Sequence, residues 1–199
     1  MATAMTLYNS EDFAWPCAVI VCAAGAGRRM GINKALARLA NGQSFLDHIS
    51  SCIRAAGLST IYVVTGAQAD EVIAAHPNAA QWVHNFAWNE TSMMDSLRLA
   101  LRRLPAQWAA IHWPVDCVGI EPDAIRALLR ERQHCALLGH RGKWGHPVLL
   151  SPRAVRELVV CHKRYSRLND YLATFATNVV CVEGGEAALN NVNVPLRTL

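Results

Sequence analysis

The sequence predicts an α/β protein, a three-layer α/β/α sandwich around a mostly parallel, Rossmann-like sheet. Apolar runs typical of buried strands alternate almost without exception with stretches of helical spacing. The first strand is apolar without a break, as expected when helices cover both faces of a sheet. With 199 residues, 52% of them hydrophobic, the chain can bury a substantial core. We therefore expect a single domain over residues 17–199, after a loose leader at residues 1–16.

The amino-terminal half is expected to alternate three strands with three helices. The strands are expected at residues 17–22, 60–65 and 81–85, and the helices at residues 43–56, 68–75 and 92–104. Ser44 can cap the first of these helices and Gly57 can end it. In the third helix the apolar side chains at helical spacing are expected to face the core, and the arginines to face solvent. The apolar set is Met93, Leu97, Ala100, Leu101 and Leu104, and the arginines are Arg98, Arg102 and Arg103.

The carboxyl-terminal half continues the alternation. Strands are expected at residues 108–113, 135–138, 147–150, 178–182 and 189–194, and helices at residues 122–130, 152–159 and 168–176. Pro122 suits the first turn of its helix. Residues 139–145, rich in glycine, histidine and cations, are expected to form a loop between two strands.

Composition excludes several classes of protein. The net charge of +4 is mild, and the cations form neither a long run nor a stripe interleaved with aromatic residues, which disfavours nucleic-acid binding. No apolar stretch approaches the roughly 20 residues of a membrane span. Residues 1–16 lack the basic start and apolar run of a signal peptide. The seven cysteines include no Cys-x-x-Cys pair, so we expect reduced cysteines and a cytoplasmic protein.

The strongest functional signal follows the first strand. The strand ends in a small-residue loop that contains Gly25, Gly27, Arg28 and Arg29, and Lys34 follows a few residues later. Glycines let backbone N–H groups approach an anion closely, and cations complete its neutralisation. This order predicts a binding site for a polyphosphate.

Two common nucleotide loops do not match the sequence. A P-loop requires Gly-Lys followed by Ser or Thr, whereas Lys34 lies between Asn33 and Ala35. A dinucleotide fingerprint requires an acidic residue at the end of the second strand, where this chain has Thr65 and Gly66. Paired arginines within the loop suit a triphosphate better than a dinucleotide.

Residues 23–31, Ala-Ala-Gly-Ala-Gly-Arg-Arg-Met-Gly, together with Lys34, resemble the signature of the Rossmann-like nucleotidyltransferases. Their pattern is Leu-Ala-Ala-Gly-x-Gly/Ser-x-Arg-Met-Gly-x-x-Lys. Later stretches resemble further motifs of that superfamily in the same order: residues 88–101, Pro-Val-Asp at 114–116, Gly-His-Pro-Val at 145–148 and Asn-Val-Asn-Val-Pro at 191–195. The molybdenum cofactor cytidylyltransferase and guanylyltransferase group is the most similar. The resemblance covers residues 17–195 and implies a nucleotide-diphospho-sugar transferase-like fold.

The resemblance implies a magnesium-dependent nucleotidyltransferase that moves a nucleoside monophosphate, CMP by preference, from CTP or another NTP. The acceptor would be phosphorylated, possibly of the molybdopterin type, and pyrophosphate would be released. The implied catalytic residues are Arg29 on the β- and γ-phosphates, Lys34 on the α-phosphate, and Asp116. Asp116 and Asn193 would hold Mg²⁺, since Mg²⁺ is bound by few protein oxygens together with substrate phosphates.

The same resemblance implies the contacts with each substrate. The expected nucleotide contacts are Ala23, Ala24, Gly25, Ala26, Gly27, Arg28, Thr65, Gly66 and Ser96. His146 and Lys143 are expected to receive the acceptor, because a loop rich in glycine and cations can close on an anionic ligand. The expected partners are the NTP, a small phosphorylated acceptor and a protein that receives the finished cofactor.

The sequence departs from the pattern at its far end. Asn191 and Asn193 stand where the group has an Asp-x-Asp pair, and an amide oxygen brings no charge to a metal. Met93 and Met94 likewise replace the usual Gly-Met. These departures leave open an active enzyme with a weaker metal site and an enzyme with an altered substrate. They also leave open a non-catalytic nucleotide- or cofactor-binding relative. Because the first motif is shared across the superfamily, a nucleotidyltransferase that acts on a sugar phosphate or an isoprenoid precursor is a further alternative.

Overall fold

One mixed sheet of seven strands organises the protein in the computed structural model, which describes residues 13–27, 31–78, 80–161 and 164–192. The strand order is β3-β2-β1-β4-β6-β5-β7. The strands are β1 (Cys17–Cys22), β2 (Ile61–Thr65), β3 (Gln81–His84), β4 (Ala109–Pro114), β5 (Cys135–His140), β6 (Lys143–Leu150) and β7 (Val179–Glu183). All pairs are parallel except those of β6 with β4 and β5. The predicted fold class is confirmed. Most of the expected leader lies outside the described residues.

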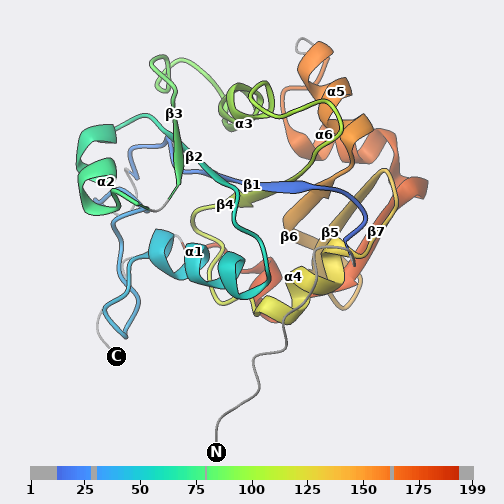
Figure 1. Ribbon diagram of the computed structural model, residues 1–199, viewed down its shortest axis with the longest axis horizontal. Helices are drawn as coiled ribbons and strands as arrows, with labels where there is room; N and C mark the ends of the chain where they lie inside the picture. The colour runs from blue at the N-terminus through green and yellow to red at the C-terminus, as the bar shows by residue number, and fades with distance from the viewer. Residues whose placement is uncertain (1–12, 28–30, 79, 162–163, 193–199) are drawn as a thin grey trace, which may run out of the picture.

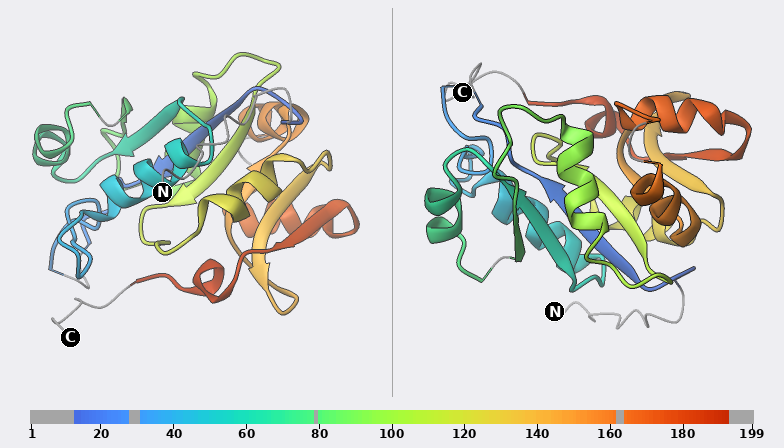
Figure 2. Two further views of the ribbon diagram at one scale, coloured as in Figure 1. Left: turned by 60° about the horizontal axis from the view of Figure 1, so that its bottom comes forward. Right: turned by 90° about the horizontal axis from the view of Figure 1, so that it is seen from above.

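Helices cover both faces of the sheet (Figure 1). The helices are α1 (Phe45–Ala55), α2 (Ala69–Ala75), α3 (Met93–Leu101), α4 (Pro122–Leu129), α5 (Pro152–Val160) and α6 (Leu168–Thr174), with 3₁₀ turns η2 (Ala176–Asn178) and η3 (Glu186–Leu189). Helices α1 and α4 lie on one face, and α3, α5 and α6 on the other (Figure 1). Seen from above, α3 lies over β1 and β2, with α5 and α6 beside it (Figure 2). None of the described helices combines the length and hydropathy that a membrane crossing needs.

Strand β1 is buried on both faces, which is why its sequence is apolar without a break. Val19 and Val21 pack into the core cluster beneath α1 and α4. Ile20 and Cys22 pack into the cluster beneath α3, α5 and α6. The period of two along one strand thus divides the core into two layers.

The predicted helix cap at Ser44 is present. Its hydroxyl accepts a hydrogen bond from the backbone N–H of Asp47 at 3.0 Å. Helix α3 begins with a capping box in which Ser92 and Asp95 each accept from the other's backbone N–H. These caps fix where α1 and α3 start, and α3 starts beside the loop that follows β1.

The segment at residues 139–145 is a β-hairpin, so the loop between its two strands is shorter than predicted. Strands β5 and β6 continue to a tight turn at Arg141 and Gly142, whose φ angles are 50° and 74°. A two-residue hairpin turn with both φ angles positive normally has Asn, Asp or Gly at both positions. Arg141 is none of these, so the sequence does not indicate the turn. A Cβ on Gly145 would lie 2.2 Å from the carbonyl oxygen of Ala188, so this glycine serves close packing.

The predicted terminal strand at residues 189–194 is also not found in the described part. Leu189 ends η3, and residues 190–192 are in no strand. Residues 193 and 194 lie outside the described chain.

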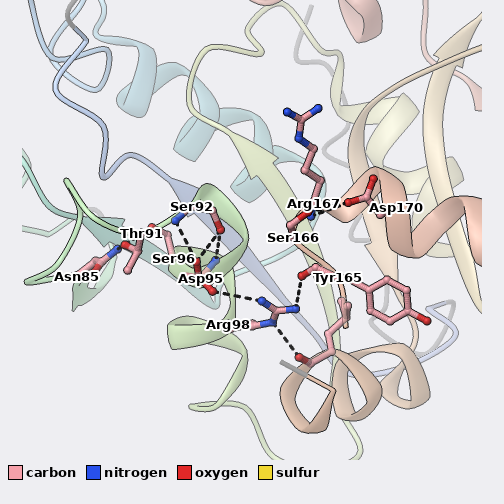
Figure 3. A network of polar contacts seen from close by, with 11 residues as sticks. Asn85, Thr91, Ser92, Asp95, Ser96, Arg98, Tyr165, Ser166, Arg167 and Asp170 are labelled. Carbon is pink, nitrogen blue, oxygen red and sulfur yellow. Dashed lines mark hydrogen bonds and ion pairs between the residues drawn. The ribbon is translucent and has the colours of Figure 1, made fainter. Parts of the chain in front are cut away.

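Two side chains of α3 face opposite to the prediction. Met93 is 53% exposed and Arg98 only 4%. The Arg98 guanidinium donates to the carbonyl oxygens of Leu158 at 3.1 Å and Tyr165 at 2.7 Å, and it pairs with Asp95 at 3.2 Å (Figure 3). Helical spacing cannot reveal a buried cation whose partners lie about sixty residues away along the chain. Arg98 thereby ties α3 to the last turns of α5 and to the segment between α5 and α6.

Replacing Arg98 should destabilise the protein strongly. Arg98→Ala leaves two buried carbonyl oxygens without their charged donor, so we expect the free energy of unfolding to fall by about 3 kcal/mol. Urea denaturation measures this loss. Arg103, exposed just after the end of α3, is the control, and Arg103→Ala should change stability by less than about 0.5 kcal/mol. Equal losses in the two variants would contradict the structural role of Arg98.

Candidate functional site

A cavity of about 330 Å³ opens beyond the carboxyl ends of β1 and β4. We call it the Gly-loop cavity. Its walls come from the loop after β1, from the residue pair that follows β4, and from the start of α3. The lining residues are Cys22, Ala23, Ala24, Gly25, Gly27, Lys34, Trp88, Thr91, Ser92, Met93, Ser96, Pro114, Val115 and Asp116. Ligands of open α/β sheets bind at such strand ends.

Backbone hydrogen bonds fix the loop after β1. Ala23 N–H donates to the carbonyl of Val64 at 2.9 Å, and the Ala24 carbonyl accepts from Ala67 N–H at 3.0 Å. Gly27 has a φ of 61°, and a Cβ there would lie 1.9 Å from the carbonyl oxygen of Ile32. Only glycine fits where the loop folds back on itself. Gly25 has open space around it, so its backbone is accessible.

A close ion pair lies in the Gly-loop cavity. Lys34 Nζ is 2.5 Å from Asp116 Oδ2, and the two side chains are 17% and 16% exposed. Asn33, fully buried, anchors the backbone beside Lys34: its amide donates to the Ala67 carbonyl at 2.9 Å, and its oxygen accepts from Ala35 N–H at 3.0 Å. Sequence reasoning assigned Asn33 no role. Its burial shows that it places the lysine.

The turn that carries Asp116 is held from two sides. The indole of the buried Trp113 donates to the carbonyl of Cys117 at 2.7 Å. The backbone N–H of Val192 donates to the carbonyl of Asp116 at 2.9 Å. The segment that begins at Asn191 therefore lies against the Asp116 turn, although the two are more than seventy residues apart in sequence.

The structure brings most of the predicted nucleotide contacts together. Ala23, Ala24, Gly25, Gly27 and Ser96 line the Gly-loop cavity with Lys34 and Asp116. Ala26 belongs to the same loop but does not line the cavity. Arg28, Arg29 and Asn193 lie outside the described residues.

Thr65 and Gly66 do not line this cavity. The Thr65 side chain is fully buried, and its hydroxyl is 3.3 Å from the ring of His84. Gly66 packs so tightly that a Cβ would lie 2.5 Å from the Cβ of Trp88. Gly66 therefore lies behind the cavity wall. Because it has no side chain, Trp88 can pack closely against it and form that wall.

Several lining residues were not predicted: Trp88, Thr91, Ser92 and Met93. They lie just before α3 or at its start. Asn85 connects two of the hydroxyl-bearing residues there, since its amide donates to Thr91 and to Ser96, each at 2.9 Å. All four belong to residues 88–101, the stretch that resembles a nucleotidyltransferase motif, and that resemblance could have identified them.

A second cavity, of about 520 Å³, adjoins the first and shares Ser92 and Met93 with it. We call it the histidine cavity. It is lined by Ser92, Met93, Met94, Leu97, His112, His146, Ser166, Arg167, Leu168 and Asn169. The rings of His112 and His146 meet edge to face at 5.8 Å. Burial lowers the pKa of His112 to about 3, with a contribution from His146. Burial also lowers the pKa of His146, opposed by the charge of Asp116.

The structure separates the two predicted acceptor contacts. His146 lines the histidine cavity, whereas the exposed Lys143 lies at the hairpin turn and lines a different hollow with His140 and Arg141. Lys143 is displaced because β6 begins at this residue and runs as an extended strand. The sequence proximity of the two residues therefore does not place them in one site.

The residues of the Gly-loop cavity fit a metal ion that is held mainly by oxygen atoms of a bound small molecule and only partly by the protein. Asp116 is the one carboxylate among the described residues that line it. No cluster of three or more His, Cys, Asp or Glu side chains suited to a metal occurs in the described part of the chain. One carboxylate combined with phosphate oxygens is a common donor set for Mg²⁺.

Comparisons with known proteins identify the family and the fold. The family model of the MobA-like NTP transferase domain matches residues 19–178. The structure is similar to a nucleotidyl transferase from Methanothermobacter, with 20% identity, a TM-score of 0.75, and coverage of 90% of this chain and 92% of that one.

Two further solved structures are similar. Rv0371c from Mycobacterium tuberculosis has 20% identity, a TM-score of 0.73, and coverage of 91% and 94% of the two chains. Its complex with manganese is also known. The inositol-1-phosphate CTP transferase from T. maritima has 12% identity, a TM-score of 0.66 and coverage of 89% of each chain. At these identities the likeness shows the fold. A search of curated proteins found no match.

The buried His112 should make stability depend on pH. Its pKa is depressed in the folded state, so unfolding takes up a proton between about pH 3 and the ordinary histidine value near 6.5. This contribution is complete above about pH 6.5 and is lost as pH falls. We expect His112 to account for a loss of about 2 kcal/mol between pH 7 and pH 5.

Urea denaturation at pH 7 and pH 5 measures how much of the loss is due to His112. The His112→Gln variant is compared with the unaltered protein at each pH. The variant should lose less stability on acidification. A difference between the two proteins that stays constant with pH would contradict the neutral, buried state of His112.

Proposed function

The chain belongs to the MobA-like NTP transferase domain family, and we propose that it transfers a nucleoside monophosphate, CMP by preference, from an NTP to a small phosphorylated acceptor, releasing pyrophosphate. The observation that carries the proposal is the Lys34–Asp116 pair beside an accessible glycine loop. A cation and a carboxylate in contact at the end of a buried strand suit a site that neutralises phosphate charge.

In this proposal the triphosphate lies along the loop after β1. Backbone N–H groups around Gly25 would bind its oxygens, and Arg29 would hold the β- and γ-phosphates. Lys34 would move from Asp116 to the α-phosphate as negative charge develops there. The half-buried location strengthens each of these interactions, because water screens them less than at the surface.

The reaction is an in-line displacement at the α-phosphorus. An oxygen of the acceptor's phosphate forms a bond to that phosphorus, and the bond to the oxygen bridging the α- and β-phosphates breaks. Pyrophosphate leaves with the electron pair. The chain's contribution is to position both substrates and neutralise charge.

A divalent cation fits the same site. Asp116 would hold Mg²⁺ together with phosphate oxygens, and Asn193 is a proposed second ligand. When bound, the cation supplies further positive charge to the phosphates. The manganese complex of the mycobacterial protein supports a divalent cation.

The base would enter between Trp88 and the small residues Ala23 and Ala24. Trp88, Ala23 and Ala24 line the same cavity, an aromatic surface beside small side chains suits a flat ring, and Ser96 adds a hydroxyl group. The name of the T. maritima enzyme, a CTP transferase, supports CTP. We further propose a molybdopterin-type acceptor, transfer of the product to a cofactor-recipient protein, and a cytoplasmic location, all on the motifs quoted above.

A second candidate is a nucleotide- or cofactor-binding protein that has lost catalysis. This candidate is supported by the hydrogen bond from the backbone N–H of Val192 to the carbonyl of Asp116. That bond brings the segment that begins at Asn191 beside the residue whose carboxylate would bind the metal. Asn191 and Asn193 replace the charges that a metal would normally meet there.

Nucleotide binding should be selective and measurable without an acceptor. CTP at a hundredfold excess over its Kd should stabilise the protein by about 2.7 kcal/mol, more with Mg²⁺ than without it. For a chain of this size, this shifts the melting temperature by roughly 5–10 °C. Thermal denaturation with CTP, GTP, ATP and UTP measures the preference. Equal shifts with all four would contradict a CMP donor, and no shift would contradict the nucleotide site.

Pyrophosphate release should depend on the ion pair. Lys34→Met and Asp116→Asn should each lower the rate by at least about a hundredfold, because each removes charge placed at the reacting phosphate. The assay uses CTP with a panel of phosphorylated acceptors. Arg103→Met, which replaces an exposed cation that does not line the cavity, is the control and should keep the full rate.

The outcome also separates the two candidates. Rapid pyrophosphate release by the unaltered protein excludes the non-catalytic relative. Tight CTP binding without turnover, together with turnover gained by Asn193→Asp, supports it. Full activity in both Lys34→Met and Asp116→Asn would contradict the proposed catalytic site.

A further inference from the structure

We propose that the histidine cavity binds the acceptor and that Arg167 binds an anionic group of it. This inference rests on the transferase function proposed above. Sequence reasoning placed the acceptor's cation at Lys143, which lines a different hollow. The structure offers Arg167 instead, from a segment to which the sequence assigned no function.

The two cavities have a common wall. Ser92 and Met93 line both, so ligands bound in the two cavities would meet across the start of α3. Two lining residues of the different cavities are also in contact: the thiol of Cys22, in the Gly-loop cavity, is 3.7 Å from Nδ1 of His112, in the histidine cavity. His146 lies close enough to Asp116 for that carboxylate to influence its pKa. A ligand in the histidine cavity therefore lies beside the proposed reaction centre.

Arg167 gives the histidine cavity its charge. It is the only charged side chain among the described residues that line the cavity. The lowered pKa values of His112 and His146 leave both rings neutral near pH 7. Within the described chain the guanidinium forms no ion pair, and Figure 3 shows it extending away from Asp170. An unbalanced guanidinium at a cavity wall favours phosphate or carboxylate.

The backbone that carries Arg167 is held in place. The Tyr165 carbonyl accepts from the buried Arg98 at 2.7 Å. The Asp170 carboxylate accepts from the hydroxyl of Ser166 and from the backbone N–H of Arg167, each at 3.1 Å (Figure 3). Arg98 belongs to α3, the helix that lines both cavities. One buried cation thus sets the position of Arg167 relative to the Gly-loop cavity.

The remaining walls indicate the body of the acceptor. Met93, Met94 and Leu97 supply an apolar side, and the neutral rings of His112 and His146, set edge to face, supply an aromatic one. Such walls suit a compact, largely apolar or ring-shaped body. The inferred acceptor class is a small molecule with a ring and at least one anionic group.

Phenyl phosphate is a suitable probe because it joins a ring to a phosphate. We expect its addition to the full chain to shift the imidazole NMR signals of His112 and His146, assigned with His→Gln variants. Arg167→Gln should weaken its binding about tenfold, the loss of one charge-assisted hydrogen bond. Arg164→Gln is the matched control, because Arg164 is an exposed arginine three residues away, and it should change the affinity less than twofold. Benzyl alcohol, which keeps the ring without the charge, should bind at least tenfold more weakly.

Three results would overturn the inference: equal effects of the two arginine variants, phenyl phosphate binding that leaves both histidine signals unmoved, or benzyl alcohol binding as tightly as phenyl phosphate. CTP affinity, measured in the same samples, should be unchanged by Arg167→Gln, and a loss of CTP binding in that variant would also count against it. Failure of the proposed function looks different. In that case CTP does not bind and no pyrophosphate is released, whereas the Arg167-dependent binding of phenyl phosphate persists.

Discussion

The parallel pairing of β1 with β4 is the constraint on which the site depends. The register sets Cys22 opposite Pro114, so the loop after β1 and the turn that carries Asp116 leave the sheet side by side. Parallel strands end at the same edge of a sheet, and β1 must be buried on both faces. The contact between Lys34 and Asp116, 82 residues apart in sequence, follows from that register together with the buried Asn33.

Helix α3 joins the two cavities into one site. Its first turn lines both, and its capping box fixes that turn through Ser92 and Asp95. Asp95 also pairs with Arg98, which holds the segment after α5. Hydrogen bonds to the charged side chain lower the pKa of Asp95, with Ser92 the largest contributor, so the carboxylate stays ionised. The relative position of the cavities therefore depends on a short chain of polar contacts that runs from the exposed capping box to the buried Arg98.

Local patterns predicted the strands and helices well where burial is uniform. Strand β1 has the predicted bounds because both faces are apolar, and the cap at Ser44 is a local hydrogen bond. The tight turn at Arg141 and Gly142 was predicted as a longer loop between two strands, because the turn uses an arginine at a positive φ. Arg98 was misplaced because its acceptors are backbone carbonyls from another part of the fold, which leave no pattern in the sequence.

The sequence by itself determined the alternation of strands and helices, the glycine loop and the two charges at Lys34 and Asp116, because each depends on residue type and local spacing. Tertiary structure alone decided which residues share a cavity. Thr65 and Gly66 lie behind the wall of the Gly-loop cavity, Lys143 lines a separate hollow at the hairpin turn, and Arg167 lines the same cavity as His146. Strand register, close backbone packing and buried hydrogen bonds determine which residues line each cavity. All three act between residues that are far apart along the chain, so local sequence patterns do not reveal them.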